Sequence, residues 1–327
     1  MNRTLLYILL FSAPLCSHLR LAAQDYQDLS ALYNSRQITL VITDSGLGGL
    51  AVMEDVSRRM KESGCFRKVN LVFVNALFDE ETGYNALRTK KEKTDMFDRV
   101  LSAISSRYTP DAILIGCNTL SVLFDETSFS GTSRTPVIGI VDAGIEVIGE
   151  KLMADPSSRV IIFGTETTIE ENSHKNGLLS MGIAGDRIVT KACPQLQSYI
   201  EQDPVSEETE MLISVYMNEA LEELEQDGGP VFASLNCSHF GYSEELWRKA
   251  FGETAYTLGG ILNPNSSMGD ILTAGKCRKR YSKTKISFLV VSGVEMPNAV
   301  TIAGYFREDS PEIAGALENY TLIPGLF

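Results

Sequence analysis

The sequence predicts an α/β fold of two similar three-layer lobes with mostly parallel sheets. Two observations lead to it: short apolar runs alternate with longer amphipathic segments, and two of the runs end in the same kind of cysteine turn, at Cys117 and at Cys237. Such alternation is typical of strand–helix–strand units. The repeated turn indicates two related halves. Because ligands of these sheets lie beyond the carboxyl ends of the strands, we expect an active site in the cleft between the lobes.

The expected elements follow in chain order. Buried parallel strands read as continuous apolar runs, and such runs occupy residues 38–43, 69–74, 111–115, 159–163, 230–235 and 285–291. Helices are expected at residues 51–61, 88–107 and 207–227, and from about residue 297 onwards. The third of these helices precedes Gly228, which with the glycine and proline after it forms a stop signal.

Composition bounds the class of protein. With 327 residues and 44% apolar content, the chain is long enough for two domains with cores of their own. The formal net charge of −13 argues against nucleic acid as a partner. An acidic small molecule would meet a repulsive overall field. Local donors, such as backbone N–H groups at helix N-termini, would therefore have to bind it.

The first two dozen residues differ from the rest. Arg3 precedes an apolar stretch at residues 5–15 that is too short to span a bilayer, and small Ala22 and Ala23 precede polar residues. This pattern predicts a secretory signal peptide over residues 1–23, followed by an N-terminal extension over residues 24–37. We therefore expect a periplasmic or secreted protein. An uncleaved segment that tethers the protein to the membrane is the alternative.

The cysteines carry the strongest chemical indication. One of the six lies in the predicted signal, and the odd number that remains favours free thiols over a disulfide framework. Cys65 and Cys277 are expected to be ordinary thiols, buried or at the surface. Cys117 and Cys237 each end a strand, and two opposed thiols can invert a carbon stereocentre: one thiolate removes a proton while the other thiol delivers one to the opposite face. Two buried structural cysteines are the alternative.

Six short motifs occur in an order that resembles the aspartate/glutamate racemase superfamily, and glutamate racemases most closely. The motifs are DSGLGGL at residues 44–50, CNT at 117–119, PVIGI at 136–140, GTETT at 164–168, ACP at 192–194 and CSH at 237–239. The resemblance runs from about residue 38 to the C-terminal end. It implies two lobes between which the chain crosses twice, which we place at residues 38–136 plus 241–327 and at residues 137–240.

The resemblance also implies the catalytic residues. Cys117 and Cys237 would exchange the proton, Asp44 would assist the first thiol, and His239 would assist the second. A carboxylate or an imidazole can accept or orient a thiol proton, which makes both pairings chemically sensible. The alternatives are a capping role for Asp44 in the glycine-rich turn and a core position for His239. Cys193 would belong to the wall of the fold.

The remaining motif residues would bind the substrate. By resemblance, Asn118, Thr119 and Ser238 would hold the α-carboxylate and the amino group, whereas the side-chain carboxylate would be held by Ser45, Thr165 and Thr168. Each could instead be an N-cap.

The sequence departs from the usual family motifs at two places. Ser238 replaces a threonine. In the loop at residues 75–87, Tyr84 matches the loop tyrosine of the family, but Asn85 replaces a glycine whose backbone would meet the side-chain carboxylate.

Taken together, the resemblance implies a cofactor-independent racemase of glutamate. It needs no pyridoxal phosphate, and no metal-ligand spacing is apparent in the sequence. The expected partners are a small amino-acid substrate and, as in other family members, a second copy in a homodimer. Two alternatives stay open: a racemase or isomerase for aspartate or another small carboxylic acid, and an exported amino-acid-binding protein without turnover.

Overall fold

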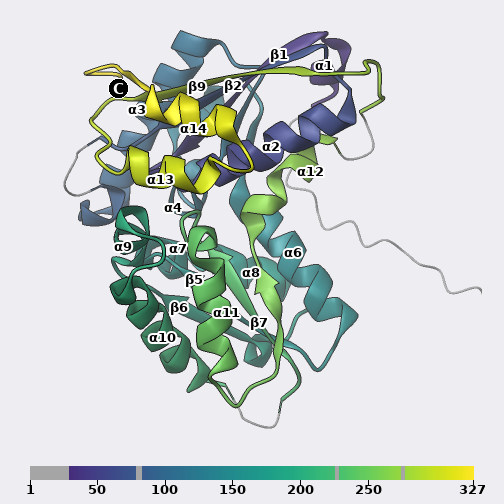
Figure 1. Cartoon of the computed structure of the whole chain (residues 1–327). Helices are drawn as coiled ribbons and strands as arrows, with labels where there is room; N and C mark the ends of the chain where they lie inside the picture. The colour runs from purple at the N-terminus through teal and green to yellow at the C-terminus, as the bar shows by residue number, and fades with distance from the viewer. Residues whose placement is uncertain (1–28, 79–82, 225–227, 274–276) are drawn as a thin grey trace, which may run out of the picture.

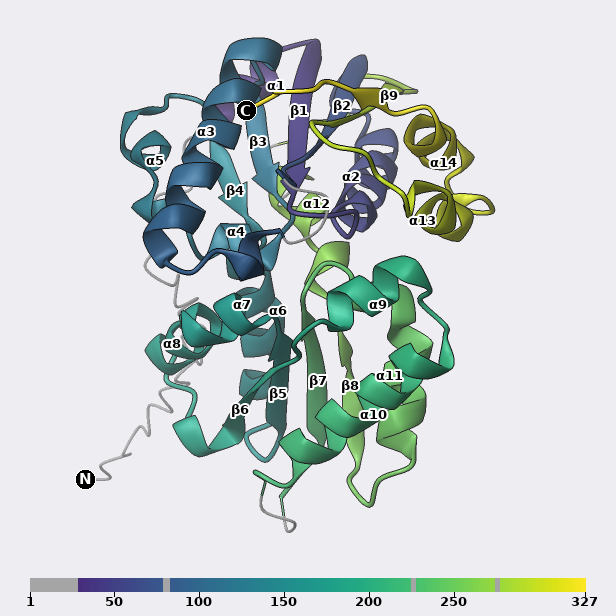
Figure 2. The ribbon, with the colours of Figure 1, turned by 90° about the vertical axis from the view of Figure 1, so that its left-hand side faces the viewer.

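The computed structural model describes residues 29–78, 83–224, 228–273 and 277–327. Its two lobes are stacked one above the other, each with a parallel sheet covered by helices on both faces (Figures 1 and 2). This confirms the predicted fold class. The predicted signal peptide at residues 1–23 lies outside the described residues. Within the described ranges, no helix is both long enough and apolar enough to cross a membrane.

Lobe one holds a six-stranded sheet in the order β10-β9-β2-β1-β3-β4, with every pair parallel. The strands are β1 (Gln37–Asp44), β2 (Lys68–Asn75), β3 (Ala112–Ile115), β4 (Val137–Gly139), β9 (Lys285–Ser292) and β10 (Thr321–Leu322). One face carries α2 (Leu50–Ser63), α13 (Ala299–Phe306) and α14 (Pro311–Glu318), and the other carries α3 (Lys90–Tyr108) and α5 (Ser128–Thr132), as Figure 2 shows.

Lobe two holds a four-stranded parallel sheet in the order β6-β5-β7-β8. Its strands are β5 (Arg159–Gly164), β6 (Ile188–Ala192), β7 (Val231–Asn236) and β8 (Leu258–Leu262). Helices α6 (Ile140–Ala154) and α8 (Ser173–Ser180) cover one face, and α9 (Leu196–Gln202), α10 (Glu207–Leu221) and α11 (Glu244–Gly252) cover the other. The remaining short helices are α1 (Ser30–Asn34), α4 (Asn118–Ser121), α7 (Glu166–Glu170) and α12 (Met268–Thr273).

Local sequence chemistry sets where the long helices begin and end. Thr89 caps α3: its hydroxyl accepts from the backbone N–H of Glu92 at 3.2 Å, and the Glu92 carboxylate accepts from the backbone N–H of Thr89 at 3.0 Å. Helix α10 starts after the Ser206 cap and ends at Leu221, earlier than the predicted residue 227. Glutamates at positions 222 and 223 oppose the helix dipole there, which disfavours continuation.

The sheets divide the chain differently from the predicted lobe boundaries. Strand β4 pairs with β3 in lobe one, although residues 137–240 were expected to form lobe two. Strand β8 pairs with β7 in lobe two, although the return to lobe one was expected at residue 241. The chain therefore crosses into lobe two along α6, which starts directly after β4, and it crosses back after β8. Both displaced strands are short, with three residues in β4 and five in β8.

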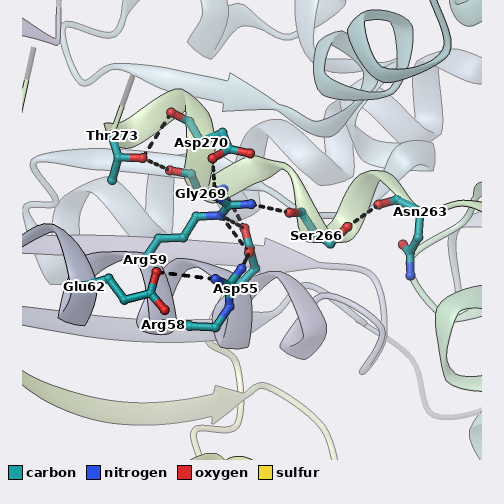
Figure 3. A network of polar contacts seen from close by, with 9 residues as sticks. All are labelled: Asp55, Arg58, Arg59, Glu62, Asn263, Ser266, Gly269, Asp270 and Thr273. Atoms are coloured by element: carbon teal, nitrogen blue, oxygen red, sulfur yellow. Dashed lines mark hydrogen bonds and ion pairs between the residues drawn. The ribbon is translucent and has the colours of Figure 1, made fainter. Parts of the chain in front are cut away.

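A network of charged and amide groups fixes the returning segment to α2 (Figure 3). The Asp55 carboxylate, 5% exposed, accepts from Arg59 Nε at 2.9 Å and from the backbone N–H of Gly269 at 2.9 Å. The Arg59 guanidinium also bonds Asp270 and donates to the Ser266 carbonyl at 2.9 Å. A paired carboxylate and guanidinium, each with further bonds, make a specific anchor. The second crossing is thereby attached to the helix that follows the glycine-rich turn.

A disulfide joins Cys65 and Cys277, whose Cα atoms lie 5.6 Å apart. The expectation that these two are ordinary thiols was therefore wrong. Their separation of 212 residues explains the miss, because only the fold brings the end of α2 beside the segment before β9. Among the cysteines that the structure describes, Cys117, Cys193 and Cys237 are free and buried.

Candidate active site

A cavity of about 280 Å³ lies between the two lobes. It is lined by all four predicted catalytic residues and by Ser45, Tyr84, Asn118, Thr119, Thr165 and Ser238. Among the described side chains, one predicted binding residue, Thr168, is not part of the lining; its hydroxyl lies 2.9 Å from that of Thr165. The predicted binding residue Asn85 lies in the 3₁₀ turn Tyr84–Ala86, and its side chain is outside the described part of the structure. The strand ends of both sheets thus meet at one site, as the parallel topology predicts.

The first thiol, Cys117, follows β3 and is only 5% exposed. Its Sγ lies 3.1 Å from the Ser45 hydroxyl, which follows β1. Burial, together with the nearby Asp44 carboxylate, raises the pKa of Cys117 above its ordinary value, against the lowering effect of the Ser45 hydrogen bond. Cys117 is therefore held as a neutral thiol, ready to donate a proton.

Asp44 ends β1 and is fully buried beneath the glycine-rich turn. One carboxylate oxygen accepts from the backbone N–H of Gly46 at 3.1 Å, within the glycine-rich turn. The predicted alternative of a capping role is wrong, because the N-cap of α2 is Gly49 and that helix has no side-chain cap. Burial raises the pKa of Asp44 to about 6, although the charge of His239 and the Ser238 hydroxyl act to lower it. A carboxyl group with a pKa near neutrality can both accept and release a proton at physiological pH.

The second thiol, Cys237, follows β7 and is followed two residues later by His239. The imidazole Nε2 lies 2.6 Å from Oε2 of Glu201, and the same oxygen accepts from the backbone N–H of Leu47 at 3.2 Å. Burial acts to lower the pKa of His239, but hydrogen bonds to Cys237 and Glu201 outweigh it and raise the pKa well above its ordinary value. His239 is therefore protonated and places a positive charge beside Cys237.

Glu201 is a site residue that the sequence analysis missed. It lies in α9, where Gln197 precedes it by one helical turn, and both side chains line the cavity. Burial acts to raise the pKa of Glu201, yet the hydrogen bond and the charge of His239 lower it below the ordinary value. Glu201 and His239 therefore form an ion pair at the cavity wall. Ser198, Gln202 and Asn298 line the same wall and were also missed.

The glycine-rich turn packs directly on the second cysteine turn. A Cβ at Gly46 would lie 2.8 Å from Cε1 of His239. A Cβ at Gly48 would overlap the Ser238 hydroxyl and lie 2.6 Å from the backbone nitrogen of His239. These contacts join the two lobes at the site, and the close approach requires glycine.

Gly48→Ala should therefore lower the activity of this site by about 10²-fold or more, because the added methyl meets backbone and must push the glycine-rich turn away from the second cysteine turn. Steady-state kinetics, with circular dichroism as a check of folding, would measure this. Gly131→Ala is the matched control, since a Cβ there meets nothing within 4 Å. Equal activity in the two variants would contradict the proposed close packing.

Three threonine hydroxyls form a buried cluster on the lobe-two side. Thr119 Oγ1 lies 2.7 Å from Thr165 Oγ1, which lies 2.9 Å from Thr168 Oγ1. Thr165 also caps α7 by accepting from the backbone N–H of Thr168 at 3.4 Å, so the predicted N-cap reading holds as well. The cluster links the first cysteine turn to lobe two and presents hydroxyls to the cavity.

Two further groups offer unused hydrogen-bonding capacity to the cavity. Both amide atoms of Asn118 and the hydroxyl of Tyr84 are buried without a partner. The Tyr84 ring is held edge-on against Phe78 at a centroid distance of 5.2 Å. Buried groups of this kind are normally satisfied, so these atoms are available to a bound molecule. Among the described residues that line the cavity there is no lysine or arginine.

The fold and the site define a class of protein: two α/β lobes with parallel sheets whose strand ends enclose a polar cavity carrying a thiol from each half. The family model for Asp/Glu/hydantoin racemases matches residues 46–240, which is more than half of the chain. The chain belongs to the Asp/Glu/hydantoin racemase family, as the resemblance predicted, and this places it among the racemases.

Individual relatives agree with this assignment. Glutamate racemase from Sulfurihydrogenibium sp. (strain YO3AOP1) is 28% identical over 202 residues, which cover 61% of this chain and 70% of that protein. The solved structure of glutamate racemase isoform RacE1 from Bacillus anthracis gives a TM-score of 0.66 at 17% identity, over 83% of this chain and 94% of that one. Glutamate racemase from Francisella tularensis, solved in complex with D-glutamate, gives 0.64 at 16% identity, over 88% and 98%. The structural likeness confirms the fold.

Proposed function

We propose that this protein interconverts L- and D-glutamate by a two-thiol mechanism that needs no cofactor. The observation that carries the proposal is the placement of Cys117 and Cys237, which come from strand ends in different lobes and line one cavity. Each thiol has its own assisting groups. Asp44 and Ser45 accompany Cys117, whereas the pair of His239 and Glu201 accompanies Cys237.

The chemistry follows from these environments. In one direction the Cys237 thiolate, stabilised by the protonated His239, removes the α-proton of the substrate. Cys117, held as a neutral thiol, then delivers its proton to the opposite face of the carbanion. The cycle leaves Cys117 as the thiolate and Cys237 as the thiol, and the reverse reaction uses them in that state. Glu201 keeps the imidazole charged and oriented throughout.

Neutral donors supply the recognition of an anionic substrate. We assign the α-carboxylate and the amino group to Asn118, Thr119 and Ser238, which line the cavity. The side-chain carboxylate would be met by Ser45 and Thr165. The Francisella tularensis protein, solved with D-glutamate, supports an amino acid of this size. Because Asn85 stands where the family has a glycine, aspartate is the second candidate substrate.

We also propose that the protein works outside the cytoplasm. The apolar leader at residues 5–15 supports export, and so does the Cys65–Cys277 disulfide, because such bonds persist mainly in oxidising compartments. The catalytic thiols would be oxidised only slowly there, because each is only 5% exposed. A homodimer remains part of the proposal by family likeness.

The test is isotope exchange in deuterated water. Incubated with the purified protein and no added pyridoxal phosphate or metal, L-glutamate and D-glutamate should each take up one deuterium at the α-carbon, measured by NMR, and each should yield its enantiomer. Aspartate incubated in parallel decides the substrate. Alanine is the control, because it lacks a side-chain carboxylate. If neither glutamate nor aspartate takes up deuterium, the proposal is overturned and a binding protein is favoured.

A further inference from the structure

A buried polar cluster lies behind the strand that carries Cys237. Asn236 and Ser234 of β7 and His174 of α8 are all 2% exposed or less. On β7 the side chains of Ala233 and Leu235 join the core on one face of the sheet, so Ser234 and Asn236 point to the other face, which α6 and α8 cover. That face is otherwise lined by apolar residues, including Ile148, Ile162 and Leu178.

None of these polar groups is satisfied by the protein. Both amide atoms of Asn236, Nε2 of His174 and the hydroxyl of Ser234 are buried and have no hydrogen-bond partner. Native proteins pair nearly all such groups with protein or with ordered water, because an unpaired buried group costs folding free energy. Several unpaired groups at one place therefore call for a ligand.

Gly144 of α6 lies directly beside both groups. A Cβ at Gly144 would lie 3.0 Å from Nδ2 of Asn236 and 3.1 Å from Nε2 of His174. The two nitrogen atoms therefore lie no more than about 6 Å apart, a span that one water molecule can bridge with hydrogen bonds of about 3 Å. They are not hydrogen-bonded to each other.

The chemistry of the two groups selects a small neutral ligand. Burial lowers the pKa of His174 to about 4, so its imidazole is neutral at physiological pH. Burial causes that shift, and an ion bound at the same place would also lose its hydration, which disfavours a charged ligand. Water both donates and accepts, so it fits either orientation of the Asn236 amide and either tautomer of His174.

We propose that His174 and Asn236 bind an internal water molecule beside Gly144, and that this site positions Cys237. Asn236 is the last residue of β7 and directly precedes the thiol. Fixing its side chain fixes the direction in which the chain leaves the sheet. His174 is thus a positioning residue: it acts on Cys237 through the water and Asn236, without contact with the substrate.

The test compares the reactivity of the two cavity thiols in folded protein. His174→Leu removes the imidazole, and Gly144→Ala adds a methyl group within 3.1 Å of both polar atoms, which moves them away from the water. In each variant, the rate constant for alkylation of Cys237 by iodoacetamide should change by about threefold or more. The rate constant for Cys117 should stay as it is in the wild-type protein. Peptide mapping of the alkylated protein measures the two separately. His174→Gln, which restores a polar group, should bring the Cys237 rate back. Gly149→Ala is the control, because on the same helix its Cβ meets the flexible end of Met181 instead.

Two outcomes would overturn the inference. One is that Gly149→Ala alters Cys237 as much as Gly144→Ala does, which would mean general packing. The other is that a high-resolution crystal structure of the wild-type protein shows direct contact between His174 and Asn236, or an empty site, instead of one water bonded to both. Alkylation does not depend on racemase activity, so this test stands even if glutamate is not the substrate. Where activity is found, kcat should fall in His174→Leu with KM unchanged.

Discussion

Cys117→Ser and Cys237→Ser should each abolish racemisation of glutamate, with kcat lowered by at least about 10³-fold. A serine hydroxyl is nearly isosteric with a thiol but far less acidic, so it neither forms the anion that removes the α-proton nor returns a proton readily. Because racemisation uses both faces of the α-carbon, loss of either thiol stops the full cycle. Chiral chromatography of the products would measure it.

A third buried cysteine provides the control for this experiment. Cys193 is fully buried, yet it does not line the cavity. Cys193→Ala should therefore keep kcat within a few-fold of wild type and lower stability instead, since a core side chain is shortened. Full racemase activity in either Cys117→Ser or Cys237→Ser would refute the two-thiol mechanism. A 10³-fold loss in Cys193→Ala would show that the assay reports on folding and not on proton transfer.

The sequence could predict the parts of the site that lie in contiguous motifs. Cys117 and Cys237 closely follow strands, and parallel strands bring their carboxyl ends to one edge of a sheet, so each turn is expected at the ligand-binding edge of its own lobe. His239 and Asp44 are fixed by their nearness in sequence to those strand ends. These positions needed no knowledge of tertiary contacts.

Other parts depended on contacts between distant segments. Glu201 lies in an ordinary polar stretch of α9, and only the packing of that helix against the glycine-rich turn brings its carboxylate to His239. The Cys65–Cys277 bond joins residues 212 positions apart, and counting cysteines gave the wrong expectation for both. Strands β4 and β8 are short, so the apolar pattern of their residues does not indicate which of the two sheets each strand joins. In each case the missing information is a partner, not a property of the local sequence.

Removing the disulfide should lower the free energy of unfolding by about 2–5 kcal/mol, because the bond closes a long loop and restricts the unfolded chain. The double variant Cys65→Ser with Cys277→Ser tests this in urea. Reductant should produce a similar loss in the wild-type protein and none in the double variant. Equal stability of variant and wild type would contradict a bond that forms in the native protein.

The same bond lets structural and catalytic redox effects be separated. The disulfide lies at the far end of α2 from the glycine-rich turn, a helix of fourteen residues and so roughly 20 Å long. The double variant should therefore keep its kcat at low denaturant.

In protein isolated from an oxidising compartment, reductant should raise activity by recovering any oxidised Cys117 or Cys237, while it lowers stability through Cys65 and Cys277. Substrate bound in the cavity should protect activity against oxidation but leave the stability change as it was. If thiol mapping finds Cys117 joined to Cys237 in untreated protein, the pair is a structural clamp and the racemase mechanism fails.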